Sequence, residues 1–530
     1  MSGGVTPKWP ERCISSRRDG ATVADLLDAA VGQDPYKAAI VFEGSTTTYR
    51  ELDEAGNRVA NLLIGLDLKT GDRVAVQLEN RPEFVEIFLG IMRAGGVIVP
   101  ANVMYTAEEM RHILSDSGSR FLFVSDAVSH RLADIESELG SVDRVVELGE
   151  AALSGSTSYR DLVLRSPTVR PNLRIEPDAD AVIQYTSGTT GKPKGAVISH
   201  ANTITAIDTI ARLPNYPIHR ESVTLLCLPL FHTFGLNFGA GLSFAFGLTM
   251  VLIQRFDPEG VFSLIEKHRV TLFWGVPPMY YAFVNTPGLD RYDVSTLENA
   301  MTGAAILPVV IVDRFKKLTG IELCDGYGMS ESTAILTSNA AGPLFKRGSV
   351  GPPYPGIEIS IRNDAGDPLP VGEVGEICAR GPNIFRGYWK NTEATREALG
   401  GGWLHTGDLG RMDEEGYVFI VGRTKDLIIV SGYNVYPIEV ETRILEHPEV
   451  LDCAVVGVPD DYQGESVCAV VARRPGSKLD ATEVQEHCRK TLAAFKCPKL
   501  VVFRSEIPKS ASGKILKKTL REELIGTEVS

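Results

Sequence analysis

Apolar and polar positions follow two periods along roughly the first 420 residues. Stretches with the spacing of an amphipathic helix lie at Ala55–Leu66 and Pro82–Ala94. Short, largely apolar runs of strand length lie between and after them, at Arg73–Leu78, Val97–Pro100, Phe121–Ser125 and Val145–Leu148. Because helices that alternate with buried strands are typical of parallel sheets covered by helices, this part of the chain is predicted to be α/β.

The pattern changes after Gly348. From there to Gly422, short apolar runs are interrupted by Gly, Pro and Asp, which are common in tight turns. This favours a distorted antiparallel β subdomain attached to the parallel βα sheets. We therefore predict a large N-terminal domain at 1–422, a hinge at 423–426 and a small mobile α+β C-terminal domain at 427–530.

The small domain is expected to begin with the apolar run Asp426–Val430 and a loop of sequence SGYNVYP. A helix is expected at Pro437–Leu445, since proline suits the first helical position. Asp480 with Glu483 resembles a capping box for a helix that ends at about Phe495. Strands are predicted at Ala454–Val458, Val467–Ala472 and Val501–Phe503.

One apolar stretch, Ser222–Gln254, contains no Asp, Glu, Lys or Arg and is long enough to span a bilayer. Pro229, His232 and several glycines interrupt it, whereas a spanning helix is more continuously apolar. We interpret the stretch as a strand at Val223–Leu228, a loop and further buried structure near a ligand pocket.

Composition narrows the class of protein. The 530 residues are 44% hydrophobic and 23% charged, as in ordinary globular proteins, and 54 Lys and Arg face 67 Asp and Glu. The net charge of −13 disfavours nucleic acid as a partner. The acidic surplus lies before Lys425, however, and the segment His487–Arg521 holds ten basic residues against one acidic residue. A basic face on the small domain is suited to nucleotide phosphates.

The spacing of cysteines and histidines indicates no disulfide or metal motif. The eight cysteines form no CxxC pair and the nine histidines form no HExxH motif, so neither a disulfide framework nor a metal motif is expected. The first residues lack the apolar core of a signal peptide, and the last three match no prenylation or peroxisomal signal. A cytoplasmic protein is expected.

The densest chemical signal is Tyr185–Gly195, YTSGTTGKPKG, with four Ser or Thr, three Gly and two Lys. Glycines let backbone N–H groups approach an anion, hydroxyls donate hydrogen bonds and lysines neutralise charge, which together suit a polyphosphate. The segment does not match the P-loop motif GxxxxGK[ST].

This segment closely resembles the signature of the adenylate-forming superfamily, which includes acyl-CoA synthetases, firefly luciferase and peptide-synthetase adenylation domains. Four further motifs recur in the order of that family, at Tyr327–Glu331, Thr406–Asp408, Gly422–Ile428 and Pro508–Lys514. The resemblance covers nearly the whole chain. It implies that ATP joins a carboxylate as an acyl-adenylate and that the acyl group then passes to a thiol.

The resemblance assigns roles to particular residues. Lys514 would bridge the carboxylate and the α-phosphate, where negative charge develops. Glu331 and Thr186 would hold Mg²⁺, and Asp408 and Arg423 would contact the ribose. The full predicted ATP site comprises Thr186, Ser187, Gly188, Thr189, Thr190, Gly191, Lys192, Gly303, Ala304, Ala305, Asp325, Gly326, Tyr327, Gly328, Met329, Ser330, Asp408, Arg423 and Lys514.

The apolar stretch resembles the acyl-pocket motif of the family, in which His232 lies beside the substrate carboxylate and is counted as catalytic with Lys514 and Glu331. The predicted pocket comprises Phe231, His232, Phe234, Asn237, Phe238, Trp274, Gly303 and Gly328. The two glycines would leave room for a bulky acid, whereas Trp274 would shorten the pocket.

The family's pivot matches Lys425, about which the small domain would rotate between two half-reactions. In the second pose the segment Ser431, Gly432 and Tyr433 would face the pantetheine of CoA. Lys496 and Lys499 are further predicted CoA contacts.

The sequence therefore predicts an ATP-dependent carboxylate–CoA ligase that uses ATP, Mg²⁺ and CoA and acts on a hydrophobic fatty or aryl acid. His232 argues against an amino-acid-activating domain, which generally has Asp at this motif. A ligase that loads a carrier protein, a luciferase-like oxygenase and a non-catalytic nucleotide-binding scaffold remain alternatives. The expected partners are small molecules, with no nucleic acid and no transmembrane segment; a homodimer stays open.

Overall fold

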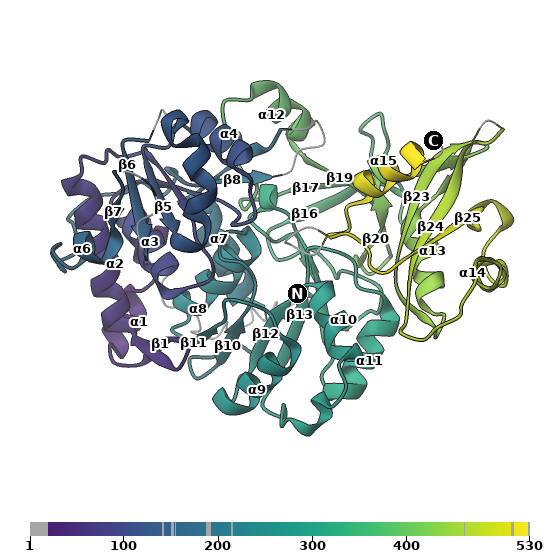
Figure 1. Cartoon of the computed structure of the whole chain (residues 1–530), viewed down its shortest axis with the longest axis horizontal. Coiled ribbons are helices and arrows are strands. Elements are labelled where there is room, and N and C mark those ends of the chain that lie inside the picture. The colour runs from purple at the N-terminus through teal and green to yellow at the C-terminus, as the bar shows by residue number, and fades with distance from the viewer. Residues whose placement is uncertain are drawn as a thin grey trace, which may run out of the picture.

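The computed structural model describes residues 20–139, 142–149, 153, 155–186, 192–213, 216–460, 462–509 and 514–527. Two large sheets, a smaller antiparallel sheet and a C-terminal sheet follow one another across the molecule (Figure 1). This mixed α/β architecture confirms the predicted fold class, with parallel sheets in the N-terminal part and a small α+β part at the C-terminus.

The first sheet has eight strands, and its central six are parallel. In spatial order they are β15 (Thr337–Ser338), β14 (Leu323–Tyr327), β13 (Asn299–Thr302), β12 (Leu272–Gly275), β10 (Val223–Leu226), β11 (Thr249–Leu252), β1 (Ala38–Phe42) and β2 (Ser45–Thr48).

The second sheet also has eight strands. In spatial order they are β18 (Gly387–Tyr388), β9 (Lys194–Ser199), β8 (Asp180–Thr186), β4 (Val97–Pro100), β3 (Arg73–Gln77), β5 (Phe121–Ser125), β6 (Arg144–Leu148) and β7 (Thr157–Ser158). The predicted strands at β4 and β5 are confirmed to the residue. One continuous apolar core includes residues of both sheets and of the helices between them.

Helices cover the two sheets of the N-terminal part. They are α1 (Asp28–Gln33), α2 (Tyr49–Gly65), α3 (Pro82–Arg93), α4 (Ala107–Ser117), α5 (Asp126–Ser129), α6 (Tyr159–Val163), α7 (His200–Ala211), α8 (Gly241–Ala245), α9 (Pro258–His268), α10 (Pro277–Asn285), α11 (Val309–Thr319) and α12 (Thr392–Ala398).

Two of these helices show how sequence and packing combine. The helix predicted to begin at Ala55 begins at Tyr49, because Thr48 and Glu51 form a capping box that the apolar spacing did not reveal. Helix α3 packs so closely on α2 that a Cβ at Gly90 would lie 2.4 Å from Val59.

The uncharged stretch is buried core. It forms β10 (two residues shorter than predicted), a loop, the π-helical segment Phe234–Ala240, α8 and β11. A Cβ at Gly235 would lie 2.1 Å from the carbonyl oxygen of Pro229, so only glycine fits at this bend. Within the described residues, no helix combines the length and apolar character that crossing a bilayer requires.

The predicted antiparallel subdomain is a four-stranded sheet of β16 (Glu358–Arg362), β17 (Gly375–Arg380), β19 (Leu404–Met412) and β20 (Val418–Arg423). The short helix Thr424–Asp426 joins it to the small domain on the right of Figure 1. That segment coincides with the predicted hinge, and the rotation about it remains a proposal.

The C-terminal sheet consists of β22 (Tyr433–Val435), β21 (Ile428–Val430), β24 (Gly464–Arg473), β23 (Val450–Asp460) and β25 (Leu500–Arg504). Its helices are α13 (Pro437–Leu445), as predicted, α14 (Ala481–Arg489) and α15 (Lys517–Thr527). The capping box of Asp480 and Glu483 is present.

Two predictions for the small domain are wrong. The SGYNVYP segment is a hairpin rather than a loop, because Ser431 and Gly432, with φ of 50° and 83°, form a two-residue turn between β21 and β22. Helix α14 ends at Arg489 rather than near Phe495, and the Phe495 ring instead stacks on Tyr433 with centroids 4.8 Å apart.

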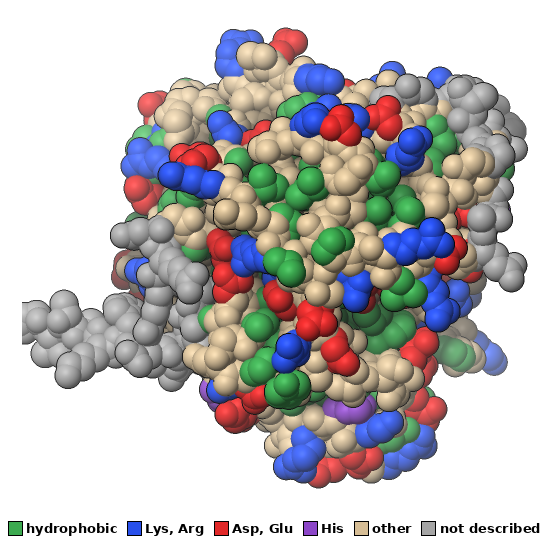
Figure 2. All heavy atoms as spheres, turned by 90° about the vertical axis from the view of Figure 1, so that its left-hand side faces the viewer, with side chains coloured by type: hydrophobic (Ala, Val, Ile, Leu, Met, Phe, Trp, Pro, Cys, Tyr) green, Lys and Arg blue, Asp and Glu red, His purple; other side chains and the backbone are tan. Residues whose placement is uncertain are grey.

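The face at the left of Figure 1 is shown in Figure 2. Basic and acidic side chains are interspersed over it, among apolar ones. That distribution differs from the basic stripe typical of nucleic-acid-binding surfaces.

Candidate active site

Four neighbouring parallel strands, β10, β12, β13 and β14, end at the same edge of the first sheet. The segments that follow them carry His232, Val276, Gly303 and Gly328. Ligands of open α/β sheets bind outside the carboxyl ends of the strands. The topology thus gathers the predicted acyl and adenine segments at one edge.

A cavity of about 260 Å³ lies at this edge. It brings together residues of four of the five motifs and the small domain. Of the predicted ATP site, its lining contains Ala304, Ala305, Asp325, Gly326, Tyr327, Gly328, Met329, Asp408, Arg423 and Lys514.

Asp408 lines this cavity, and its carboxylate makes one hydrogen bond and one ion pair. Its Oδ2 accepts a hydrogen bond from the hydroxyl of Tyr327 at 2.7 Å, and its Oδ1 lies 2.9 Å from Nε of Arg423, its cross-strand neighbour. The charge of Asp408 is the main cause that raises the pKa of Arg423. A buried carboxylate fixed in this way is suited to accept hydrogen bonds from ribose hydroxyls.

Lys514 reaches the cavity from the small domain. Desolvation lowers its pKa, and the neighbouring charge of Arg423 lowers it further, whereas the carboxylates of Asp408 and Glu331 oppose this shift. The ammonium group is therefore placed among charges of both domains. In this arrangement the predicted catalytic lysine meets the predicted ATP site.

Glu331 is 6% exposed, and its Oε1 accepts a hydrogen bond from the hydroxyl of Tyr388 at 2.8 Å. Nζ of Lys194 lies over the Tyr388 ring, 5.5 Å from its centroid, in a cation–π contact. Thr186 and Lys194 are cross-strand partners at the last described pair of β8 and β9, so the two described ends of the signature segment lie side by side. The predicted contacts Ser187, Gly188, Thr189, Thr190 and Gly191 lie outside the described residues; Lys192 follows them and is exposed.

Three aromatic residues of the predicted acyl pocket pack against one another. Phe238 packs edge-on against Phe234 and Trp274, with centroids 5.3 and 5.2 Å away. A Cβ at Gly303 would touch the Phe234 ring at 3.4 Å. Trp274 is fully buried and donates its indole N–H to Tyr216 at 2.7 Å, so it is a fixed wall.

Not every predicted pocket residue has the expected surroundings. A Cβ at Gly328 would lie 2.2 Å from the carbonyl oxygen of Ala334, so close backbone packing already requires this glycine. Phe231 is part-buried, and its carbonyl accepts a hydrogen bond from Gln184. Ser330 lies within 3.4 Å of the Thr233 hydroxyl, between the acyl and adenine segments.

His232 is neutral under ordinary assay conditions. Desolvation, with a smaller contribution from the charge of Lys514, lowers its pKa to about 4. Its Nδ1 accepts the backbone N–H of Phe234 at 3.3 Å. Because Nδ1 accepts, the neutral imidazole carries its proton on Nε2, which can donate a hydrogen bond to a carboxylate.

This shift predicts a pH dependence of stability. The unfolded chain, with an ordinary histidine pKa of about 6.5, binds a proton between pH 6.5 and 4 that the folded chain does not, so stability falls as the pH decreases through that window. His232→Gln should reduce the loss of unfolding free energy between pH 7 and pH 5 by about 1–2 kcal/mol. Urea unfolding at both pH values measures it. His219→Gln, at a half-exposed site, is the control, and equal losses in wild type and His232→Gln would contradict the assignment.

The predicted CoA contacts lie on the small domain and are not among the residues that line this cavity. Tyr433 is 60% exposed at the hairpin turn. Lys496 pairs with both carboxylate oxygens of Glu439 at 2.8 Å, and Lys499 pairs with Asp460. Both lysines therefore have acidic partners in this arrangement.

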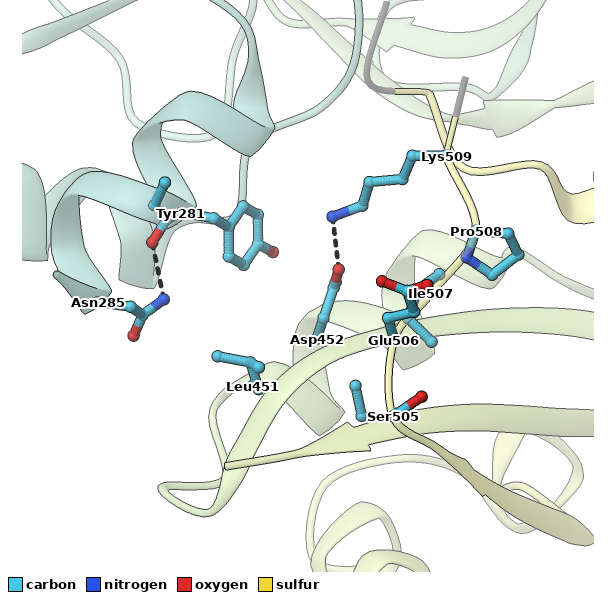
Figure 3. Close-up of a pocket in the computed structure, with 11 residues that line it drawn as sticks. Tyr281, Asn285, Leu451, Asp452, Ser505, Glu506, Ile507, Pro508 and Lys509 are labelled. Atoms are coloured by element: carbon cyan, nitrogen blue, oxygen red, sulfur yellow. Dashed lines mark hydrogen bonds and ion pairs between the residues drawn. The ribbon is translucent and has the colours of Figure 1, made fainter. Parts of the chain in front are cut away.

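A second cavity, of about 660 Å³, separates α10 from the small domain (Figure 3). The Tyr281 ring faces Lys509, whose Nζ lies 5.5 Å from the ring centroid and 2.6 Å from Asp452. At the same interface Arg474 donates to the side chain of Asn285 at 2.7 Å. The contacts of Tyr281 with Lys509 and of Asn285 with Arg474 join α10 to the small domain in the arrangement in which Lys514 lines the first cavity.

Sequence reasoning missed Tyr388, Tyr281 and Lys509. Tyr388 lies in a two-residue strand, which is too short to show a periodicity. The preceding Gly387, with φ of 136°, was a local signal of unusual backbone geometry. Tyr281 follows a helical pattern that looks like ordinary core. Lys509 stands within the PKSASGK motif, but its role depends on the partner domain.

A cavity at the ends of parallel strands, completed by a lysine from the C-terminal part of the chain, is the arrangement expected of an adenylate-forming enzyme. Comparison with known sequences agrees. The model of the AMP-binding enzyme family matches residues 27–389, and that of the AMP-binding enzyme C-terminal domain matches residues 439–514. The chain belongs to the AMP-binding enzyme family, in its acyl-CoA synthetase branch.

Individual relatives cover nearly the whole chain. A long-chain-fatty-acid–CoA ligase of Bacillus subtilis (strain 168) is 34% identical over 530 residues, 95% of this chain and 94% of its own. A feruloyl-CoA synthase of Amycolatopsis sp. is 35% identical over 488 residues, 92% and 96% of the two chains. The crystal structure of the anthranilate CoA ligase AuaEII with anthranoyl-AMP superimposes with a TM-score of 0.92 at 28% identity, covering 98% and 100%. These findings confirm the predicted class, an AMP-forming acid–CoA ligase.

Proposed function

We propose that this protein activates a hydrophobic carboxylic acid with ATP and transfers the acyl group to CoA. The observation that carries this proposal is the position of Lys514, which lines one cavity with Asp408, Arg423 and the segment 325–329. The packed aromatic rings of Phe234, Phe238 and Trp274, which belong to the predicted acyl pocket, lie beside the ends of the same strands.

In the first half-reaction, a carboxylate oxygen attacks the α-phosphorus of ATP, the bond to the β-phosphate bridge oxygen breaks and pyrophosphate leaves. Two anions must approach each other, so positive charge at the reacting atoms lowers the barrier. Lys514 supplies this charge, and His232 and the pocket orient the acid. In the second half-reaction, the CoA sulfur attacks the acyl carbon, the thiol proton is lost and AMP leaves.

Mg²⁺ fits this site by the chemistry of its donors. Glu331 offers a buried carboxylate and Thr186 a hydroxyl at the end of β8, and Mg²⁺ prefers a few oxygen ligands beside phosphate and water. When bound, it neutralises charge on the phosphates. The hydroxyl and lysine side chains of the signature segment are assigned to the same phosphates.

The side chain of Asn237 bears on which class of carboxylic acid is the substrate. Its Oδ1 and Nδ2 are both buried without a hydrogen-bond partner, and the residue is 3% exposed beside Phe234 and Phe238. Leaving such a group unpaired costs about 1–3 kcal/mol, so a substrate that pairs with it gains affinity. We assign the pocket to an aryl acid with a hydroxyl or another hydrogen-bonding substituent. The feruloyl-CoA synthase relative supports this assignment, whereas the long-chain relatives favour an unsubstituted acid.

Asn237→Leu tests the assignment, because leucine has nearly the same size but makes no hydrogen bond. We expect kcat/KM for hydroxylated aryl acids to fall by about 10–100-fold, the equivalent of about 1.4–2.7 kcal/mol. The value for an unsubstituted aryl acid or a fatty acid should stay level or rise. A uniform loss for all acids would instead mean that Asn237 only supports the pocket.

Carboxylate-dependent ATP–pyrophosphate exchange, with and without CoA, tests the proposed function itself. Exchange with an acid of the aryl panel, followed by acyl-CoA formation, is the expected result. Exchange without acyl-CoA would indicate a carrier-protein thiol as the acceptor. Absence of exchange across aromatic and aliphatic acids would leave the nucleotide-binding scaffold as the better explanation.

A further inference from the structure

Three potential metal ligands meet on the antiparallel sheet, beside the bulge Thr406–Asp408 of strand β19. Glu376 and Cys378 are two residues apart on β17 and share one face of the strand, and His405 of β19 is the direct cross-strand partner of Cys378. The two strands lie side by side in the centre of Figure 1. Of the His, Cys, Asp and Glu side chains in the described ranges, only these three gather closely enough to share an ion.

The distances among the three ligand atoms approach those of a tetrahedral site. Sγ of Cys378 lies 3.6 Å from Nδ1 of His405 and 3.9 Å from Oε2 of Glu376. Bonds of about 2.0–2.3 Å to zinc place tetrahedral ligands about 3.3–3.8 Å apart. The third edge, from Nδ1 to Oε2, is a hydrogen bond of 2.7 Å that has to open by about half an ångström when an ion replaces the shared proton.

Burial and the surrounding contacts suit a site that is open on one side. Cys378 is fully buried, whereas the side chains of His405 and Glu376 are 30% and 26% exposed, which leaves room for a water as the fourth ligand. Arg362 lies opposite Glu376 on β16 but donates to the carbonyl of Gly366 and stacks on an indole ring. The guanidinium of Arg362 is thus engaged by Gly366 and the indole ring, and the Glu376 carboxylate pairs with His405.

The second oxygen of the same carboxylate connects this cluster with the nucleotide site. Oε1 of Glu376 accepts the backbone N–H of Gly407 at 2.9 Å, and the hydroxyl of Thr406 donates to the carbonyl of Ile377 at 2.7 Å. Asp408 is the next residue along the chain. Outer contacts of this kind orient metal ligands. Here they couple the position of the Glu376 carboxylate to that of the Thr406–Asp408 bulge.

We propose that Glu376, Cys378 and His405 bind one divalent cation of the zinc class and that this ion fixes the Thr406–Asp408 bulge of β19. A thiolate and an imidazole select zinc over magnesium or calcium. Binding releases the thiol proton to solvent and moves the imidazole proton from Nδ1 to Nε2, so the three ligand atoms face the ion unprotonated.

Metal content tests the site in the full-length enzyme. The protein is stripped with a chelator, incubated with Zn²⁺, desalted and measured by elemental analysis; a parallel sample receives Co²⁺, whose bond to a thiolate gives a charge-transfer band. We expect one zinc per wild-type chain and a cobalt–thiolate band that Zn²⁺ abolishes. Cys378→Ser and His405→Gln should lose both signals, whereas Cys497→Ser, at a partly exposed thiol outside the cluster, should keep them. Wild-type enzyme that retains no zinc, or whose cobalt sample shows no thiolate band, would overturn the site, and both results are measured on wild type without relying on any variant's stability.

The coupling between the metal site and the Thr406–Asp408 bulge rests on the proposed function, and it is measured separately. Loading wild-type enzyme with zinc should lower the KM for ATP about threefold or more at constant Mg²⁺, equivalent to about 0.7 kcal/mol, and should have no such effect on Cys378→Ser. Zinc binding with an unchanged KM would overturn the link. An enzyme that binds zinc but supports no exchange with any acid would instead contradict the proposed function.

Discussion

Lys514→Ala is expected to slow acyl-adenylate formation by about 10²–10³-fold, the range found when one preorganised donor to a transition state is removed. The rate of thioester formation from supplied acyl-adenylate should stay nearly unchanged. The reason lies in the geometry: Lys514 belongs to the small domain but lines the nucleotide cavity. In the second half-reaction the proposed rotation removes it.

Two half-reaction assays measure this result, namely pyrophosphate exchange and acyl transfer from synthetic acyl-adenylate to CoA. Lys518→Ala is a matched control, because Lys518 lies four residues after Lys514 and its side chain is 78% exposed. Lys514→Arg retains the charge and should recover part of the first rate. Equal losses in both assays would contradict the assignment of Lys514 to adenylation alone.

The loss should not come from unfolding. The side chain of Lys514 is held near the positive charges of Arg423 and Lys425, both of which lower its pKa. Removal of a cation from that group relieves repulsion as well as removing attraction to Asp408 and Glu331. We therefore expect the midpoint of urea unfolding to change little, which separates a catalytic effect from a structural one.

Lys425→Pro should have the second large effect, on the opposite half-reaction. Lys425 lies in the short helix Thr424–Asp426 between β20 and β21, the segment that the rotation would pass through. Proline fixes φ near −65° and so restricts the change of backbone conformation. We expect thioester formation to fall at least about tenfold, or about 1.4 kcal/mol in activation free energy, with a smaller effect on adenylation.

Lys425→Ala is the control for this prediction, because it removes the side chain and leaves the backbone free. If the alanine variant loses as much thioester activity as the proline variant, the side chain rather than the pivot is responsible. An unaltered thioester rate in Lys425→Pro would count against the position as a hinge. The interface of Tyr281 with Lys509 and Asp452 has to open in the same movement.

Much of the site could be predicted because its residues stand in short motifs. Asp408, Arg423, Tyr327 and Lys514 line one cavity, as the resemblance implied. What the motifs did not reveal is how the residues restrain one another. The hydrogen bond from Tyr388 to Glu331 joins residues 57 positions apart, and no local pattern encodes it.

The same limit applies to the zinc-class cluster. In the sequence, Cys378 and His405 are 27 positions apart and match no metal motif. Only the pairing of β17 with β19 places them opposite each other. The hairpin turn at Ser431 and Gly432 was missed for a related reason, since its strands are short and pair only within a complete sheet.

The sequence by itself determined the order of helices and strands, the class of fold and the identity of the chemical motifs. These depend on side-chain periodicity, turn residues and caps, which act over a few residues. The tertiary structure alone decided which side chains meet, which of them are desolvated and which domain delivers Lys514. Those properties depend on strand register and domain packing, where the closing of long loops and the burial of distant apolar surfaces set the outcome.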